Sequence, residues 1–93
     1  MKHDIHIKDY DSLKDLAEDI GNLRYDALQL LLEELTNKLE RDYEADKGRG
    51  YDQLACGLYQ ICSAFRWAAR SAEKVWKISK PKMKPEDLEG TPS

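Results

Sequence analysis

The sequence has few of the residues that mark a fold rich in strands and turns. Its 93 residues include three prolines, five glycines and a single phenylalanine. Folds built from many short strands need frequent turns, which glycine and proline supply. This scarcity argues against an all-β protein. Because 35% of the residues are charged and the apolar residues recur periodically, we expect long solvated helices rather than disorder.

Long apolar runs are also missing. No stretch approaches the roughly 18 consecutive apolar residues that mark a membrane-spanning helix. The first ten residues, MKHDIHIKDY, contain acidic residues where a secretory signal peptide has an apolar segment. The sequence therefore predicts a cytoplasmic protein that has no membrane partner.

Histidine is confined to the amino terminus, which limits the chemistry expected of the chain. His3 and His6 together with Asp4 resemble a metal-binding trio, but a structural metal site needs fixed ligands. We expect residues 1–11 to form an extended, solvated arm instead. With both histidines in that arm, no Ser-His-Asp or Cys-His catalytic arrangement is expected. The sequence predicts neither a metal site nor a cofactor.

The two cysteines, Cys56 and Cys62, lie six residues apart in one predicted helix. Six helical residues correspond to about 9 Å along the axis, and the two side chains point in different directions. A disulfide between them is therefore excluded. We expect Cys62 to be a small buried residue and Cys56 to lie outside the core. Two thiols without CxxC spacing are typical of a reducing compartment.

The clearest amphipathic pattern runs from residue 54 to residue 79. Its apolar residues fall in three adjacent columns that repeat every seven residues: Leu54, Ile61, Ala68 and Val75; Leu58, Phe65 and Ala72; and Ala55, Cys62, Ala69 and Trp76. Such a broad stripe predicts a helix with a wide buried face over 52–79. Asp52 is its expected cap, and Pro81 prevents the helix from continuing much beyond Ser79.

A second helical pattern occupies residues 12–46. Ser12 is the expected cap, and Asp15 three residues later resembles a capping box. Apolar residues then recur at spacings of three and four, through Leu13, Leu16, Ile20, Leu23, Ala27, Leu30 and Leu31, Leu35, Leu39 and Tyr43. Because this spacing continues across Gly21, we expect one long helix over 12–46, which Gly21 allows to kink.

The stretch KGRG at residues 47–50 predicts the turn between the two helices, with Gly48 in the left-handed conformation that ends a helix. The chain thus divides into an arm (1–11), a helical hairpin domain (12–80) and a flexible tail (81–93). One helical turn after Pro85 is compatible with the tail sequence.

Both predicted helices carry apolar stripes wider than one partner helix covers. A lone hairpin would expose more apolar surface than monomers tolerate, so we expect two hairpins to form a dimeric antiparallel four-helix bundle. The residues predicted for its core and dimer contact are Leu28, Leu31, Leu35 and Leu39 on the first helix and Leu54, Leu58, Ile61, Phe65, Ala68, Ala72, Val75 and Trp76 on the second. A column of small residues, Gly57, Ala64 and Ser71, would allow close approach of another helix.

The net charge of −3 conceals an acidic and a basic part. Residues 1–47 contain thirteen acidic and seven basic residues, a sum of −6, whereas residues 64–84 contain seven basic residues and one acidic residue, a sum of +6. Such parts usually complement each other within a molecule or across a dimer.

One enzymatic alternative rests on the acidic residues of the first helix. All-α nucleotide pyrophosphatases bind magnesium through clustered carboxylates, and the corresponding residues here would be Glu33, Glu34, Glu40, Glu44 and Asp46. However, Asn37 stands where an E-E-x-x-E pattern has its third acid, and the second helix offers only Glu73. A solvated acidic face is therefore the favoured interpretation.

The candidate functional surface is a ridge on the second helix. Arg66, Arg70, Lys74 and Lys77 follow spacings of four, four and three, and Trp67 lies beside them. Trp67 can cap the bundle edge beneath Arg70, bind another protein, or stack on a nucleic-acid base. The sequence predicts a non-enzymatic interaction or regulatory module that presents this ridge to an acidic protein. A nucleic-acid regulator is the alternative, which the acidic net charge disfavours, and a carboxylate–metal nucleotide hydrolase is third.

Overall fold

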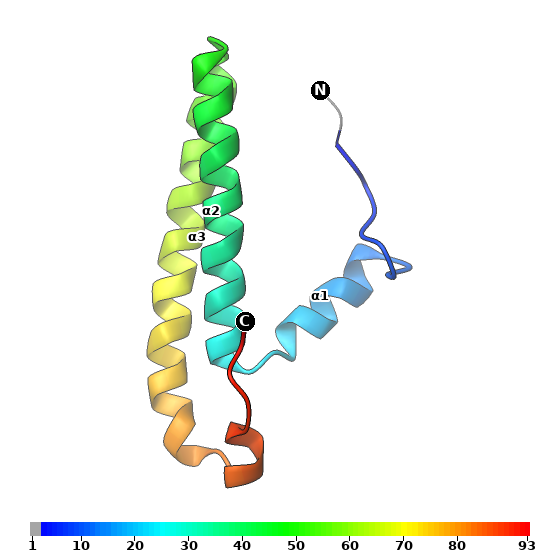
Figure 1. Ribbon diagram of the computed structural model, residues 1–93, viewed down its shortest axis with the longest axis vertical. Helices are drawn as coiled ribbons and strands as arrows, with labels where there is room; N and C mark the ends of the chain where they lie inside the picture. Colours follow the sequence, from blue (N-terminus) through cyan, green and yellow to red (C-terminus); the bar gives the residue numbers. More distant parts are fainter. Residues whose placement is uncertain (1–2) are drawn as a thin grey trace.

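The computed structural model describes residues 3–93, which form an antiparallel helical hairpin with a shorter helix standing off to one side (Figure 1). The short helix is α1 (Leu13–Gly21), and the hairpin consists of α2 (Tyr25–Gly48) and α3 (Asp52–Ser79). Two 3-10 turns follow, η1 (Lys80–Lys82) and η2 (Pro85–Leu88). The predicted all-α hairpin is confirmed.

The prediction of one continuous helix over 12–46 is wrong. α1 ends at Gly21, and the backbone N–H of Asn22 donates to the carbonyls of Glu18 (3.1 Å) and Asp19 (3.2 Å). Arg24 then has an extended backbone (φ −57°, ψ 144°) before α2 begins. Apolar spacing shows which side chains share a face, but it does not test whether the backbone remains helical between them. Glycine and asparagine, both poor helix formers, supply the break.

The turn between α2 and α3 also differs from the prediction. α2 continues to Gly48, and the left-handed residue is Gly50 (φ 78°). The backbone N–H of Tyr51 donates to the carbonyl of Asp46 at 2.9 Å, which reverses the chain. Asp52 does not cap α3, because it is the first helical residue, and no side chain caps this end. We call this end of the hairpin its tip and the opposite end its base.

The predicted cap of α1 is confirmed. The Ser12 hydroxyl oxygen accepts a hydrogen bond from the backbone N–H of Asp15 at 3.1 Å. This bond satisfies one of the amides that the first helical turn leaves without a partner.

Small side chains form the contact between α2 and α3. The buried residues of α3 are Ala55, Cys62, Ala69 and Ala72. Short side chains allow two helix backbones to approach closely, and larger side chains such as Leu39, Leu58 and Phe65 are half-buried beside them. Cys62 is buried and Cys56 is exposed, as predicted. Burial raises the pKa of the Cys62 thiol.

Arg24 fixes the base of the hairpin. Its Nε atom donates to Oδ1 of Asp26 at 2.6 Å, and its Nη2 atom donates to Oδ2 at 2.8 Å. The guanidinium carbon also lies 5.3 Å from the centroid of the Trp76 ring. Arg24 therefore joins the start of α2 to the end of α3.

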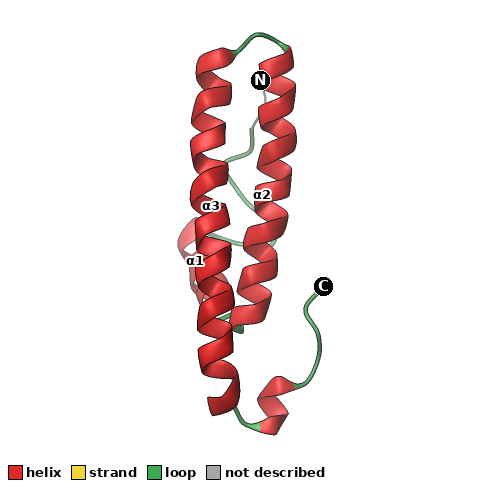
Figure 2. Cartoon of the chain, turned by 90° about the vertical axis from the view of Figure 1, so that its left-hand side faces the viewer, coloured by secondary structure: helices red, strands yellow, loops and turns green. Residues whose placement is uncertain are grey.

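The same guanidinium group binds the carboxy-terminal tail. Nη1 donates to the carbonyls of Asp87 (3.1 Å) and Glu89 (2.9 Å), and Nη2 donates to the carbonyl of Gly90 (2.9 Å). With Asp26, all five N–H donors of the group have an acceptor. The tail thus folds back along the base of the hairpin (Figure 2). Its predicted flexibility stays a prediction.

Within residues 3–93, no helix is both long and apolar enough to cross a membrane.

Candidate interaction surfaces

One side of the hairpin is apolar and uncovered. Large apolar residues of both helices are exposed on it by 36–44%: Leu31, Leu35, Leu54, Ile61 and Val75. We call these five residues the apolar face. They belong to the predicted core and dimer set, whose members Leu28, Leu39, Leu58, Phe65, Ala68 and Trp76 are half-buried and whose member Ala72 is buried. The α2–α3 contact therefore covers only part of the predicted stripe.

The amino-terminal arm and α1 lie on the same side as the apolar face. His3 of the arm borders a shallow pocket together with Leu54 and Leu58. Figure 1 shows α1 leaving the base at an angle, and Figure 2 shows it behind the hairpin. The space beside the apolar face is therefore flanked by α1.

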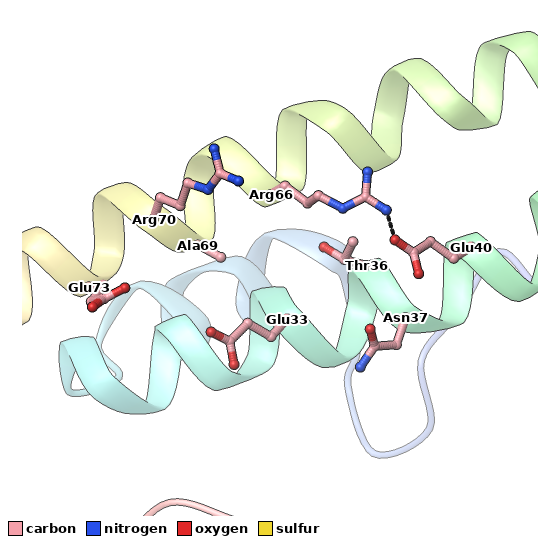
Figure 3. A pocket seen from close by; sticks show the side chains of 8 residues that line it. All are labelled: Glu33, Thr36, Asn37, Glu40, Arg66, Ala69, Arg70 and Glu73. Carbon is pink, nitrogen blue, oxygen red and sulfur yellow. Dashed lines mark ion pairs between the residues drawn. The ribbon is translucent and has the colours of Figure 1, made fainter.

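The opposite side of the hairpin carries a polar groove of about 210 Å³ (Figure 3). Its lining residues are Glu33, Thr36, Asn37, Glu40, Arg66, Ala69, Arg70 and Glu73. Arg66 of α3 forms an ion pair with Glu40 of α2, and Glu73 pairs with Lys77 at 3.0 Å. The acidic and basic parts of the sequence thus meet across the hairpin.

Three of the carboxylates considered for metal binding line this groove, whereas Glu34, Glu44 and Asp46 do not. Glu33, Glu40 and Glu73 line it together with Arg66 and Arg70, whose charges offset the carboxylates. From His3 onward, no group of three or more His, Cys, Asp or Glu side chains is arranged to hold a metal ion. The arrangement is that of an interhelical ion-pair cluster.

The predicted ridge divides between the groove and the outer surface. Arg66 and Lys77 are engaged in ion pairs on the groove side. Trp67 is 64% exposed, and the guanidinium carbon of Arg70 lies 5.9 Å from the centroid of its ring. Lys74 is exposed on the same helix. The structure therefore brings Trp67 and Arg70 together as an exposed cation–aromatic pair.

Sequence reasoning missed two features of these surfaces. Arg24 was treated only as one charge among many, although it bears the most extensive hydrogen-bonding network of the described residues. The Arg66–Glu40 pair was also missed, since the register of α2 against α3 depends on the length of the turn. The sequence signal that could have indicated the Arg24 network is the pairing of Arg24 with Asp26, an acidic residue two positions later at the start of a helix.

Comparison with protein-family models, with curated proteins and with solved structures found no match to this chain.

Proposed function

We propose that the protein is a non-enzymatic interaction module of the cytoplasm that forms a dimer through its apolar face. The exposure of Leu31, Leu35, Leu54, Ile61 and Val75 along one side of the hairpin carries this proposal. Contiguous apolar surface of this kind marks a site of association. The two free thiols are consistent with a reducing compartment.

The side of the hairpin that carries the apolar face is large enough for a stable dimer. At 1.5 Å per residue α3 is about 42 Å long, and two helices side by side are about 20 Å wide, so this side of the hairpin measures about 800 Å². Stable protein–protein interfaces bury about 800 Å² on each partner. Two hairpins packed on this side would form the two layers of a four-helix bundle.

The dimer is tested by placing a charge on the apolar face. Light scattering at micromolar concentration should give about twice the 10.8 kDa chain mass for the native protein. Ile61→Glu should give the monomer mass, because its carboxylate would be buried without a partner in the dimer. Gln60→Glu adds the same charge to the neighbouring exposed position of α3 and should remain dimeric. A native protein of monomer mass would contradict the proposal.

A second surface supports binding of an acidic protein. The guanidinium group of Arg70 lies over the aromatic ring of Trp67. Tryptophan and arginine are among the residues most enriched at binding hot spots. Lys74 extends the positive charge along α3, with Arg66 and Lys77 at its groove-side edge. Because the chain has a net charge of −3, an acidic protein patch is favoured over nucleic acid as the partner.

Charge reversal at Arg70 tests this surface. A partner captured by the native protein should be released by added salt and should not bind Arg70→Glu, with affinity reduced at least about tenfold. Lys82→Glu makes the same charge change in η1, outside the surface, and should bind normally. Unchanged binding by Arg70→Glu would show that this surface does not bind the partner. In a separate mobility-shift assay, a shift of DNA or RNA by the protein that weakens steeply with salt would favour the nucleic-acid alternative.

A further inference from the structure

α1 has an apolar stripe that is only partly covered by the rest of its own chain and makes no extended contact with the hairpin. Leu13 is 60% exposed, Leu16 and Ile20 are half-buried, and α1 contains no buried residue. Extended packing among the described helices occurs between α2 and α3 only. An amphipathic helix stabilised by propensity alone is marginal at this length, so α1 needs a surface to pack on.

α1 is attached firmly to the hairpin at its carboxy-terminal end. Arg24 is the last residue of the three-residue break after α1, and its bonds to Asp26 and to the tail hold that point at the base of the hairpin. From there α1 rises away from α2 (Figure 1), and His3 of the arm that precedes α1 borders the pocket with Leu54 and Leu58 on the side of the apolar face. Whatever covers the apolar face therefore lies beside α1.

α1 is too short to cover the apolar face of its own hairpin. Its nine residues are about 13 Å long, compared with about 42 Å for α3. Leu54 and Ile61 lie toward the tip, at the other end of the hairpin from the point where α1 is attached. An occupant of hairpin length is needed, and a second copy of this chain supplies one with a matching apolar stripe.

The charges beside the apolar face allow two copies to approach each other. Asp42 borders the pocket that contains Leu54 and Leu58, and its carboxylate is paired with Lys38 of the same helix at 2.5 Å. Asp46 and Arg49, which border the same pocket, pair with each other at 3.2 Å. Each carboxylate at this border is thus paired with a cation, which lowers like-charge repulsion between two copies.

We propose that a second copy occupies the apolar face and that α1 of each copy packs its apolar stripe onto the hairpin of the other. This inference rests on the proposed dimer and adds a reciprocal contact to it. Two-fold symmetry makes the contact occur twice. α1 then acts as a clasp that is fixed to its own hairpin through Arg24 and holds the partner copy through Leu13, Leu16 and Ile20.

Photo-cross-linking from α1 tests where this helix packs. Leu13→Cys in a Cys56→Ser background is labelled with a benzophenone maleimide; Cys62 is buried and is not expected to react. Chains grown with ¹⁴N and with ¹⁵N are mixed, irradiated and analysed by mass spectrometry. We expect cross-links from α1 to α2 or α3 in which one peptide is light and the other is heavy. Ala17→Cys, on the same stripe, serves as a second variant in case Leu13→Cys weakens the dimer.

The other outcomes separate the clasp from the dimer. Glu18→Cys places the label on the opposite side of α1 and should lose the mixed light–heavy cross-links. A dimer mass with cross-links only within single chains, or with none to α2 or α3, would overturn the clasp and leave the dimer intact. A monomer mass for the unlabelled native protein would overturn both proposals.

Discussion

Arg24→Ala is expected to release the carboxy-terminal tail from the hairpin. The substitution removes the donors to the carbonyls of Asp87, Glu89 and Gly90 and leaves the half-buried Asp26 carboxylate without its cation. The amide of Asp87, which donates to the Lys84 carbonyl at 2.9 Å, should exchange faster, because the turn that contains it is no longer held to the hairpin. The midpoint of thermal unfolding should fall by several degrees.

Lys77→Ala is the control for this prediction. Lys77 also pairs with an acidic residue, Glu73, at 3.0 Å, but the two side chains are 72% and 46% exposed. Exposed pairs of this kind contribute little to stability, so the unfolding midpoint should change by less than it does in Arg24→Ala. Equal effects of the two substitutions would contradict the role assigned to Arg24.

Acid is expected to weaken the same contact. The hydrogen bond from Arg24 holds the pKa of Asp26 below its usual 3.8, so ionised Asp26 stabilises the fold above that pH. As the pH falls from 3.8 through the lowered pKa of the folded state, this stabilisation is lost. Emission of Trp76 in a Trp67→Phe background reports the change, and Asp26→Asn should remove this part of the pH dependence.

Cys62→Phe is expected to destabilise the hairpin by about 3 kcal/mol. Cys62 is 2% exposed at the contact where α2 and α3 approach each other over small side chains, and a phenyl ring there forces the helices apart. Overpacking of a well-packed contact costs about 1–3 kcal/mol, and the upper end applies because the ring is much larger than a thiol. Urea unfolding monitored by circular dichroism measures the loss.

The chain provides a control with the same chemical change. Cys56 lies on the same helix but is exposed, so Cys56→Phe should change the free energy of unfolding by no more than about 0.5 kcal/mol. A similar loss in both variants would show that close approach of α2 and α3 at Cys62 is not what stabilises the hairpin.

The sequence was informative where side-chain periodicity alone decides the structure. The seven-residue columns through Cys62 and Ala69 correctly identify the side of α3 that meets α2, and the capping pattern of Ser12 correctly starts α1. Periodicity failed at residues 22–24, because the two flanking helices keep the same apolar spacing although the backbone between them is not helical. What decides the path of the chain there is Arg24, whose acceptors lie more than sixty positions away.

The candidate surfaces were predictable to a similar extent. The spacing of Arg70 and Lys74 beside Trp67 indicates an exposed cationic strip, and Trp67 is indeed 64% exposed. The engagement of Arg66 by Glu40 depends on how α2 and α3 are aligned, which the turn at Gly50 determines. The sequence gives the charged residues of each helix, but it does not show which residues of α2 lie opposite which residues of α3.

The way Arg24 holds the tail bears on how freely the end of the chain can change during evolution. All three acceptors are main-chain carbonyls, which every amino acid possesses. Side chains at positions 87 and 89 are thus free to vary without loss of these bonds. Gly90 is the exception, since its φ of 83° is one that other residues rarely adopt. Substitutions at positions 87 and 89 would then leave the backbone of the tail in place and change only the side chains exposed at the base of the hairpin.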